Sequence, residues 1–187
     1  MNRPTLPRSP AASFVGVLAK LSLAIAGLSI VWFLFQLLLV AALGRFDLAD
    51  WMQRQYLPVP PQLDWAMQHA LAVTVLLLLL SLAFLAVSWA LLRHRQWGRA
   101  GFIVFLIAVA AANFAMLPLI NGMFDAAQSF LPSDFLASPE GRQALAQLHT
   151  TRTILFVSGL ASAFAFAALH GWLVFKLCTP DVRNLFR

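Results

Sequence analysis

The chain has 187 residues, of which 61% are hydrophobic and only 11% are charged, and its net charge is +6. Soluble domains carry about 25% charged residues, so a soluble fold of this length has no way to bury so much apolar surface. The composition therefore excludes an ordinary soluble protein. The basic residues are too dispersed for a nucleic-acid-binding face. A single cysteine, Cys178, excludes an intramolecular disulfide and a multi-cysteine metal site.

Residues 1–20 form a basic leader that we expect on the cytoplasmic side. Within it, one interpretation of Ala11–Lys20 is that they are already helical. The apolar run 21–43 is the first predicted membrane span. A signal peptide is the alternative interpretation of a basic stretch followed by an apolar run. An uninterrupted apolar run of this length exceeds the usual signal-peptide core of roughly 7–15 residues, which favours an uncleaved helix.

The first predicted outer loop, 44–67, alternates aromatic and charged residues around Trp51. This pattern is typical of a short amphipathic helix lying at a membrane surface. Three prolines then end it, and Asp64 is placed to cap a further helix that begins near Trp65. That helix leads into the second predicted span, 70–92.

The segment 93–99 lies between two apolar runs, 70–92 and 100–120, that contain no charged residue. Each run, as a helix, is about as long as the hydrocarbon of a bilayer is thick. Because the short connection holds three arginines and a histidine, it must remain in water. The sequence predicts a tight hairpin of two membrane helices with a basic tip.

The second predicted outer loop, 121–152, contains Ser138-Pro139-Glu140, a typical helix start with serine as the N-cap and proline in the first turn. This helix is placed to run into the fourth predicted span, 154–178, which is stopped by Thr179-Pro180-Asp181. Residues 179–187 form a predicted basic cytoplasmic tail.

The sequence therefore predicts an all-α integral membrane bundle of four transmembrane helices over 21–178, with short amphipathic helices in both outer loops. The basic residues are sorted by side. The side of the hairpin tip holds nine of them, and the opposite side holds Arg45, Arg54, Arg142 and Arg152. The positive-inside rule then places both termini in the cytoplasm. The strong preference for arginine over lysine indicates a bacterial genome, hence the bacterial inner membrane.

Two short motifs carry a resemblance. Arg95-Gln96-Trp97-Gly98-Arg99, and the tail Thr179-Pro180-Asp181-Val182-Arg183-Asn184-Leu185-Phe186, resemble features of uncharacterised small four-helix bacterial inner-membrane proteins with an Arg-x-Trp-Gly-Arg hairpin. The resemblance implies location and no activity. Physically, Arg93, Arg95, Trp97 and Arg99 are expected at the lipid headgroups, where they fix the topology.

The histidines are the first candidates for a cofactor site, because facing histidines in a helix bundle can hold haem. His69 and His149 lie near the outer ends of spans, whereas His94 lies in the hairpin tip and His170 lies inside the last span. The depths of His94 and His170 differ by roughly 12 Å, which disfavours them as a haem pair. We predict no cofactor and no metal, and retain His170, His69 and His149 as weak cofactor-binding candidates.

Three buried polar side chains are expected within the spans: Gln36, Asn113 and His170. Gln36 and Asn113 lie at matching depth, so they are placed to hydrogen-bond across the bundle as structural glue, or to line a binding cavity. His170 shares a helical stripe with Gly159, Ser162 and Ala163, which favours a position facing other helices. A hydrogen bond to a carbonyl or to a serine such as Ser88 is its structural interpretation, and a proton relay or ligand contact is its functional one.

A weak internal repeat, Gly-x-Phe-Asp-x-Ala, begins at Gly44 and again at Gly122. It is typical of a parallel duplication, but aromatic and acidic turns are also common where helices leave a bilayer.

No catalytic motif is present in the sequence, and no carboxylate lies within a predicted span. The sequence therefore favours a non-enzymatic membrane protein that binds lipid or a partner protein. A small transporter or carrier, and a haem- or quinone-binding redox subunit, are the alternatives. The predicted partners are the lipid bilayer, a membrane protein or a second copy of the chain, and no nucleic acid.

Overall fold

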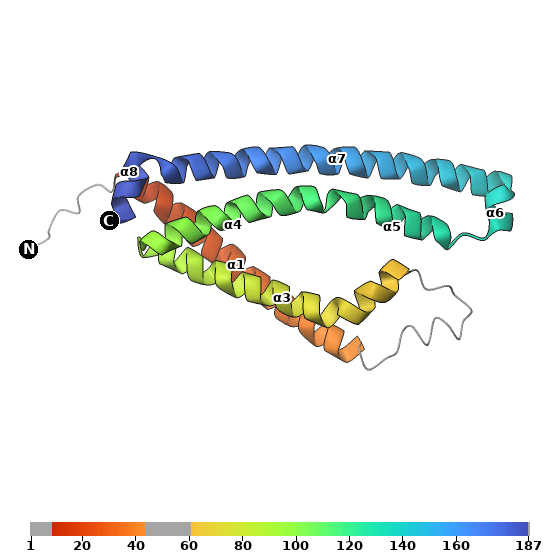
Figure 1. The fold of residues 1–187 in the computed structure, drawn as a ribbon, viewed down its shortest axis with the longest axis horizontal. Helices are drawn as coiled ribbons and strands as arrows, with labels where there is room; N and C mark the ends of the chain where they lie inside the picture. The colour runs from red at the N-terminus through yellow and green to blue at the C-terminus, as the bar shows by residue number, and fades with distance from the viewer. Residues whose placement is uncertain (1–8, 44–60, 187) are drawn as a thin grey trace, which may run out of the picture. The chain divides into compact units, whose positions relative to one another are not determined.

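The fold was determined as a computed structural model, which describes residues 9–43 and 61–186 (Figure 1). Helices account for nearly all of these residues, and no strand occurs among them. The elements are α1 (Pro10–Leu43), α3 (Pro61–Leu92), α4 (Gln96–Ala115), α5 (Leu117–Ser129), α6 (Ser133–Ala137), α7 (Pro139–Cys178), α8 (Pro180–Arg183) and the 3-10 turn η1 (Asn184–Phe186).

Four helical stretches are long and apolar enough to cross a membrane: Pro10–Ala42, Gln68–Leu92, Gln96–Ser129 and Pro139–Cys178. Their apolar side chains are mostly exposed, which is the pattern expected when lipid replaces water around the helices. The predicted all-α fold with four such helices is confirmed, and it indicates a multi-pass membrane protein.

Helix α1 begins at Pro10, so the interpretation of Ala11–Lys20 as already helical is confirmed. The start of the second helix differs from the prediction. Helix α3 begins at Pro61, because proline suits the first turn, where no backbone N–H is needed. Asp64 therefore lies inside α3 and does not precede it, so its prediction as the cap was wrong. The amphipathic helix predicted around Trp51, and the repeat copy at Gly44, lie outside the described residues.

The third span consists of two helices, α4 and α5, with a break at Met116. Pro118 causes this break, because proline has no N–H to donate and its ring would clash with the carbonyl of the preceding turn. The backbone adapts locally: Met116 N donates to Ala112 O at 3.0 Å, and Leu119 N donates to Met116 O at 3.1 Å. The second repeat copy, which begins at Gly122, lies within α5 and is helical.

Helix α7 has 40 residues and is therefore about 60 Å long, roughly twice the thickness of the hydrocarbon layer. It begins as the sequence predicts, with the Oγ of Ser138 accepting a 3.0 Å hydrogen bond from Gly141 N and Pro139 in the first turn. The second outer loop was predicted with short helices, and the helix that starts at Ser138-Pro139 was placed to run into the fourth span, as it does. The membrane helices themselves extend through most of this loop, and only α6 is short.

The C-terminal segment folds back into helix. Thr179 is extended and ends α7, as predicted, and Pro180 then starts α8. The predicted basic tail is not simply a solvated extension, because Val182 and Phe186 are buried, with only 3% and 5% of their surfaces exposed.

The chain divides into two compact units. The first comprises the described residues within Met1–Leu37, Thr74–Ala108 and His170–Arg187, and the second comprises those within Leu38–Val73 and Val109–Leu169. In the first unit, the start of α1, the α3–α4 hairpin, the end of α7 and α8 gather at one end (Figure 1). Their shared core consists of Val15, Ala19, Leu91, Phe102, Leu106, Leu177, Val182 and Phe186. In the second unit, α5 lies beside α7.

Candidate functional site

The connection between α3 and α4 is tight because Gly98 packs directly on the backbone of α3. A Cβ atom at position 98 would lie 2.5 Å from the N atom of Leu91 and 2.6 Å from the carbonyl carbon of Ala90. His94 makes the turn possible with a positive φ of 53°. The glycine of the Arg-x-Trp-Gly-Arg motif is thus required for close approach of two helices.

Arg99 is turned toward the protein. Its Nη1 donates a 3.3 Å hydrogen bond to the carbonyl oxygen of Leu177, in the last turn of α7. Carbonyls in a last turn have no partner within their own helix, and the helix dipole there favours a positive charge. Arg99 therefore caps α7, while its Nε is buried without a hydrogen-bond partner.

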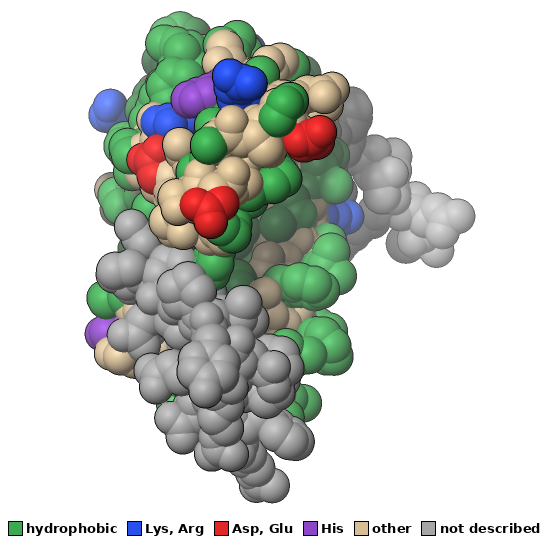
Figure 2. Space-filling model, turned by 90° about the vertical axis from the view of Figure 1, so that its right-hand side faces the viewer, with side chains coloured by type: hydrophobic (Ala, Val, Ile, Leu, Met, Phe, Trp, Pro, Cys, Tyr) green, Lys and Arg blue, Asp and Glu red, His purple; other side chains and the backbone are tan. Residues whose placement is uncertain are grey.

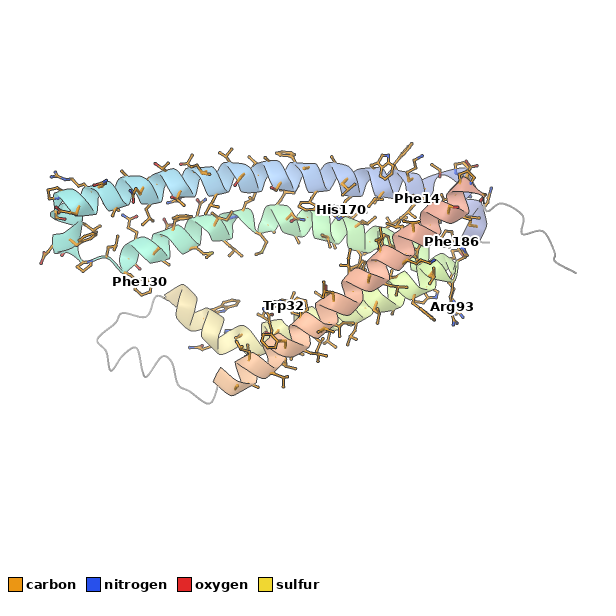
Figure 3. All side chains as sticks on the ribbon, turned by 180° about the vertical axis from the view of Figure 1, so that it is seen from behind. Phe14, Trp32, Arg93, Phe130, His170 and Phe186 are labelled. Atoms are coloured by element: carbon orange, nitrogen blue, oxygen red, sulfur yellow. The ribbon has the colours of Figure 1, made fainter. Side chains whose placement is uncertain are left out.

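The other three residues predicted at the headgroups are exposed. The guanidinium of Arg93 lies 4.7 Å from the ring centre of Trp89, one turn earlier on α3, in a cation–π contact. Figure 3 shows Arg93 projecting from the end of the hairpin. Arg95 is exposed, and so is 53% of Trp97. We call Trp89, Arg93, Arg95 and Trp97 the basic corner.

The C-terminal segment is packed against this hairpin. The rings of His94 and Phe186 meet edge to face with their centres 5.6 Å apart. Phe186 belongs to the core of the first unit, together with Leu177 and Val182. The hairpin, the end of α7 and the last residues of the chain therefore form one packed structure.

The second unit contains an apolar groove of about 520 Å³ between α5 and α7. Its volume falls within the range of about 300–1,000 Å³ that is typical of small-molecule sites. Both helices contribute to its lining, which comprises Ile120, Met123, Phe124, Ala127, Leu155, Ser158, Gly159 and Ser162. Gly159 lets the helices approach, because a Cβ there would lie 3.2–3.3 Å from Leu117 and Ile120.

One turn before the groove along α7, Arg152 forms a polar cluster with α5. Its Nε donates to Oδ1 of Asn121 and its Nη1 donates to Oδ1 of Asp125, both at 2.9 Å. A polar pocket of about 340 Å³ adjoins Arg152 and is also lined by His149 and Thr153. Figure 2 looks onto the end of the second unit formed by α5, α6 and the start of α7, where charged side chains gather.

The structure places the predicted histidines in different surroundings. His69 stacks on Trp65 with ring centres 4.6 Å apart, and its Nδ1 lies 2.9 Å from the carbonyl oxygen of that residue. His149 lines the polar pocket, and His170 is half-buried on α7. Ser88 was suggested as a partner of His170. Its Oγ is buried and accepts or donates no hydrogen bond, so Ser88 is not that partner.

The two buried amides were predicted to bond across the bundle. Asn113 instead donates from Nδ2 to the carbonyl oxygen of Val109, one turn back on its own helix, at 2.9 Å. Gln36 is half-buried in α1 and belongs to the first unit, whereas Asn113 belongs to the second. The amide of Asn113 therefore donates within its own helix.

No group of three or more histidine, cysteine, aspartate or glutamate side chains with metal-site spacing occurs within residues 9–43 and 61–186. Comparison of the chain with models of known families, with curated proteins and with solved structures finds no match. Sequence reasoning missed the groove, and Gly159 with its neighbouring serines was the only signal of it.

Proposed function

We propose that the chain is a multi-pass protein of the bacterial inner membrane with both termini in the cytoplasm. The sorting of charge supports this orientation. The sequence ranges of the first unit contain nine basic residues and one acidic residue, Asp181. Cytoplasmic segments flanking membrane helices carry such an excess of lysine and arginine. The hairpin tip, both termini and the basic corner would then lie on the cytoplasmic side.

We further propose that its function is non-enzymatic and consists of binding a membrane lipid in the α5–α7 groove. The observation that carries this proposal is the pairing of an apolar groove with a polar cluster one helical turn away. Leu155 in the groove and Arg152 in the cluster are three residues apart on α7, so they lie on the same helix face. An acyl chain fits the groove, and a polar head fits the cluster.

The polar cluster also marks where α5 and α7 leave the hydrocarbon. Arg152 is the last charged residue before the apolar part of α7 begins. Asp125 is the first charged residue after the apolar part of α4 and α5. On α7 the groove therefore begins one turn further into the apolar part than Arg152, while on α5 its lining from Ile120 to Ala127 runs alongside Asn121 and Asp125. Because lipid tails are as apolar as the groove, selectivity must come from shape and from its polar rim.

Photolabelling of the reconstituted full chain tests this proposal. The probe is a phosphatidylethanolamine with a diazirine in its acyl chain. We expect labelled peptides covering 155–162, and at least a fivefold loss of that label in Ser158→Trp, which fills the groove. Val157→Trp is the matched control, because Val157 is 58% exposed and does not line the groove. Equal labelling of both variants would show that the lipid does not occupy the groove.

A further inference from the structure

The four headgroup residues predicted at the hairpin separate into two groups. Arg99 is hydrogen-bonded to the carbonyl oxygen of Leu177 at the end of α7, and part of its guanidinium is buried. Arg93, Arg95 and Trp97 are all exposed. A ligand that approaches the hairpin from outside therefore meets two arginines and not three.

Arg93 is held in a defined position by Trp89. The guanidinium lies over the indole ring at 4.7 Å, and 49% of Trp89 remains exposed. A stacked guanidinium keeps its edge free, and the planar edge of arginine matches two oxygens of a phosphate. The stack thus presents a donor edge whose orientation is already restricted before a ligand binds.

The surroundings favour an anion. Asp181 is the only acidic residue in the sequence ranges of the first unit, against nine basic residues. The apolar stretch Gln68–Leu92 ends directly before Arg93, and the next apolar stretch starts at Gln96. Arg93 and Arg95 therefore lie at the depth of lipid headgroups. Trp89 and Trp97, which flank them, are the residue type that concentrates at that depth.

We propose that the basic corner is a binding site for the phosphate group of an anionic membrane lipid. Arg93 and Arg95 bind the phosphate, Trp89 orients Arg93, and Trp97 anchors the corner among the acyl chains. Arg99 does not take part. This site lies in the first unit and is independent of the groove between α5 and α7, so either site can fail its test without affecting the other.

Native mass spectrometry of the full chain in detergent tests the proposal. The probes are dioleoyl phosphatidylglycerol, which is anionic, and dioleoyl phosphatidylcholine, which is not. We expect preferential binding of phosphatidylglycerol, and about a 30-fold loss of that affinity in the double variant R93Q/R95Q, from the typical contribution of two basic residues near a lipid surface. Because both side chains are exposed, the double variant should unfold at the same temperature as the wild type.

The control variants are chosen to isolate the corner. Arg142→Gln removes an exposed charge from the second unit and should leave phosphatidylglycerol binding unchanged. Trp89→Phe weakens the stack and should lower the affinity without removing charge. Equal affinities of R93Q/R95Q and Arg142→Gln would overturn the proposal. Full competition by millimolar inorganic phosphate would also overturn it, since the site would then bind free phosphate and not a lipid.

Discussion

Arg99 and Leu177, 78 positions apart in sequence, are joined by a hydrogen bond from the guanidinium to a main-chain carbonyl. This bond connects the first turn of α4 to the last turn of α7. A helix end inside a membrane protein needs such partners, because its last carbonyls are otherwise unsatisfied. An arginine that looked like a topology signal is thus also part of the packing of the first unit.

Replacing Arg99 should therefore destabilise the protein. Arg99→Ala removes the cap and the charge that favours the C-terminal end of α7, and should cost about 1–2 kcal/mol. Thermal unfolding in detergent without anionic lipid measures this loss. Arg95→Ala removes the same charge nearby from an exposed side chain and should have little effect. If both variants unfold at the same temperature, the capping bond makes no contribution.

Gly98→Ala should be more damaging. The new Cβ would lie 2.5–2.7 Å from backbone and side-chain atoms of Ala90 and Leu91, so α4 must move away from α3. We expect a loss of about 2–3 kcal/mol, as for overpacking elsewhere. Gly122→Ala in α5 is the control, because nothing lies within 4 Å of its Cβ position and alanine is the better helix former. A Gly98→Ala protein as stable as Gly122→Ala would contradict the close approach.

Phe186→Ala tests whether the C-terminal segment is part of the folded structure. Only 5% of Phe186 is exposed, and its ring contacts His94, so truncation should cost about 3 kcal/mol. Phe175→Ala removes the same ring from a position that is 69% exposed and should be nearly neutral in detergent. Limited proteolysis of the tail should follow the same order. Similar unfolding temperatures for the two variants would show that the tail does not contribute to stability.

The single cysteine allows the orientation to be measured directly. Cys178 is exposed at the end of α7, on the side proposed to be cytoplasmic. A membrane-impermeant maleimide should label it in inverted inner-membrane vesicles but not in intact spheroplasts. Ser133→Cys in a Cys178→Ala background should show the reverse. Position 133 lies in α6, which directly precedes the start of α7, whereas Cys178 is at the end of α7. Labelling of Cys178 in spheroplasts would invert the proposed topology.

Local signals predicted the helices well. The charged segment 93–99 had to interrupt two apolar runs, and the structure has a turn there. Helix α7 starts at Ser138-Pro139, because the serine hydroxyl accepts a hydrogen bond from a backbone N–H of the first turn. It stops at Thr179-Pro180, because proline has no N–H with which to continue the helix. The prediction at Asp64 was wrong because Pro61 is an equally good helix start, and sequence alone does not rank the two.

Long-range features were beyond the sequence pattern. The Ser138-Pro139 signal predicts where α7 begins, but the sequence does not show that α7 pairs with α5. The groove depends on this pairing and on the helix break caused by Pro118, which sets the direction of α5. The inward turn of Arg99 likewise depends on the distant carbonyl of Leu177. The residues around Arg95–Arg99 do not indicate that Leu177 is the partner of Arg99.

The most direct test of the central claim, that the α5–α7 groove binds a membrane lipid, is native mass spectrometry of the protein gently extracted from its own membrane. In the R93Q/R95Q background, which removes the lipid proposed at the basic corner, we predict a mass excess equal to one lipid that persists in Val157→Trp but disappears in Ser158→Trp. An excess that matches haem or a quinone would contradict the account, as would a lipid adduct that is retained equally when Ser158→Trp is added to R93Q/R95Q.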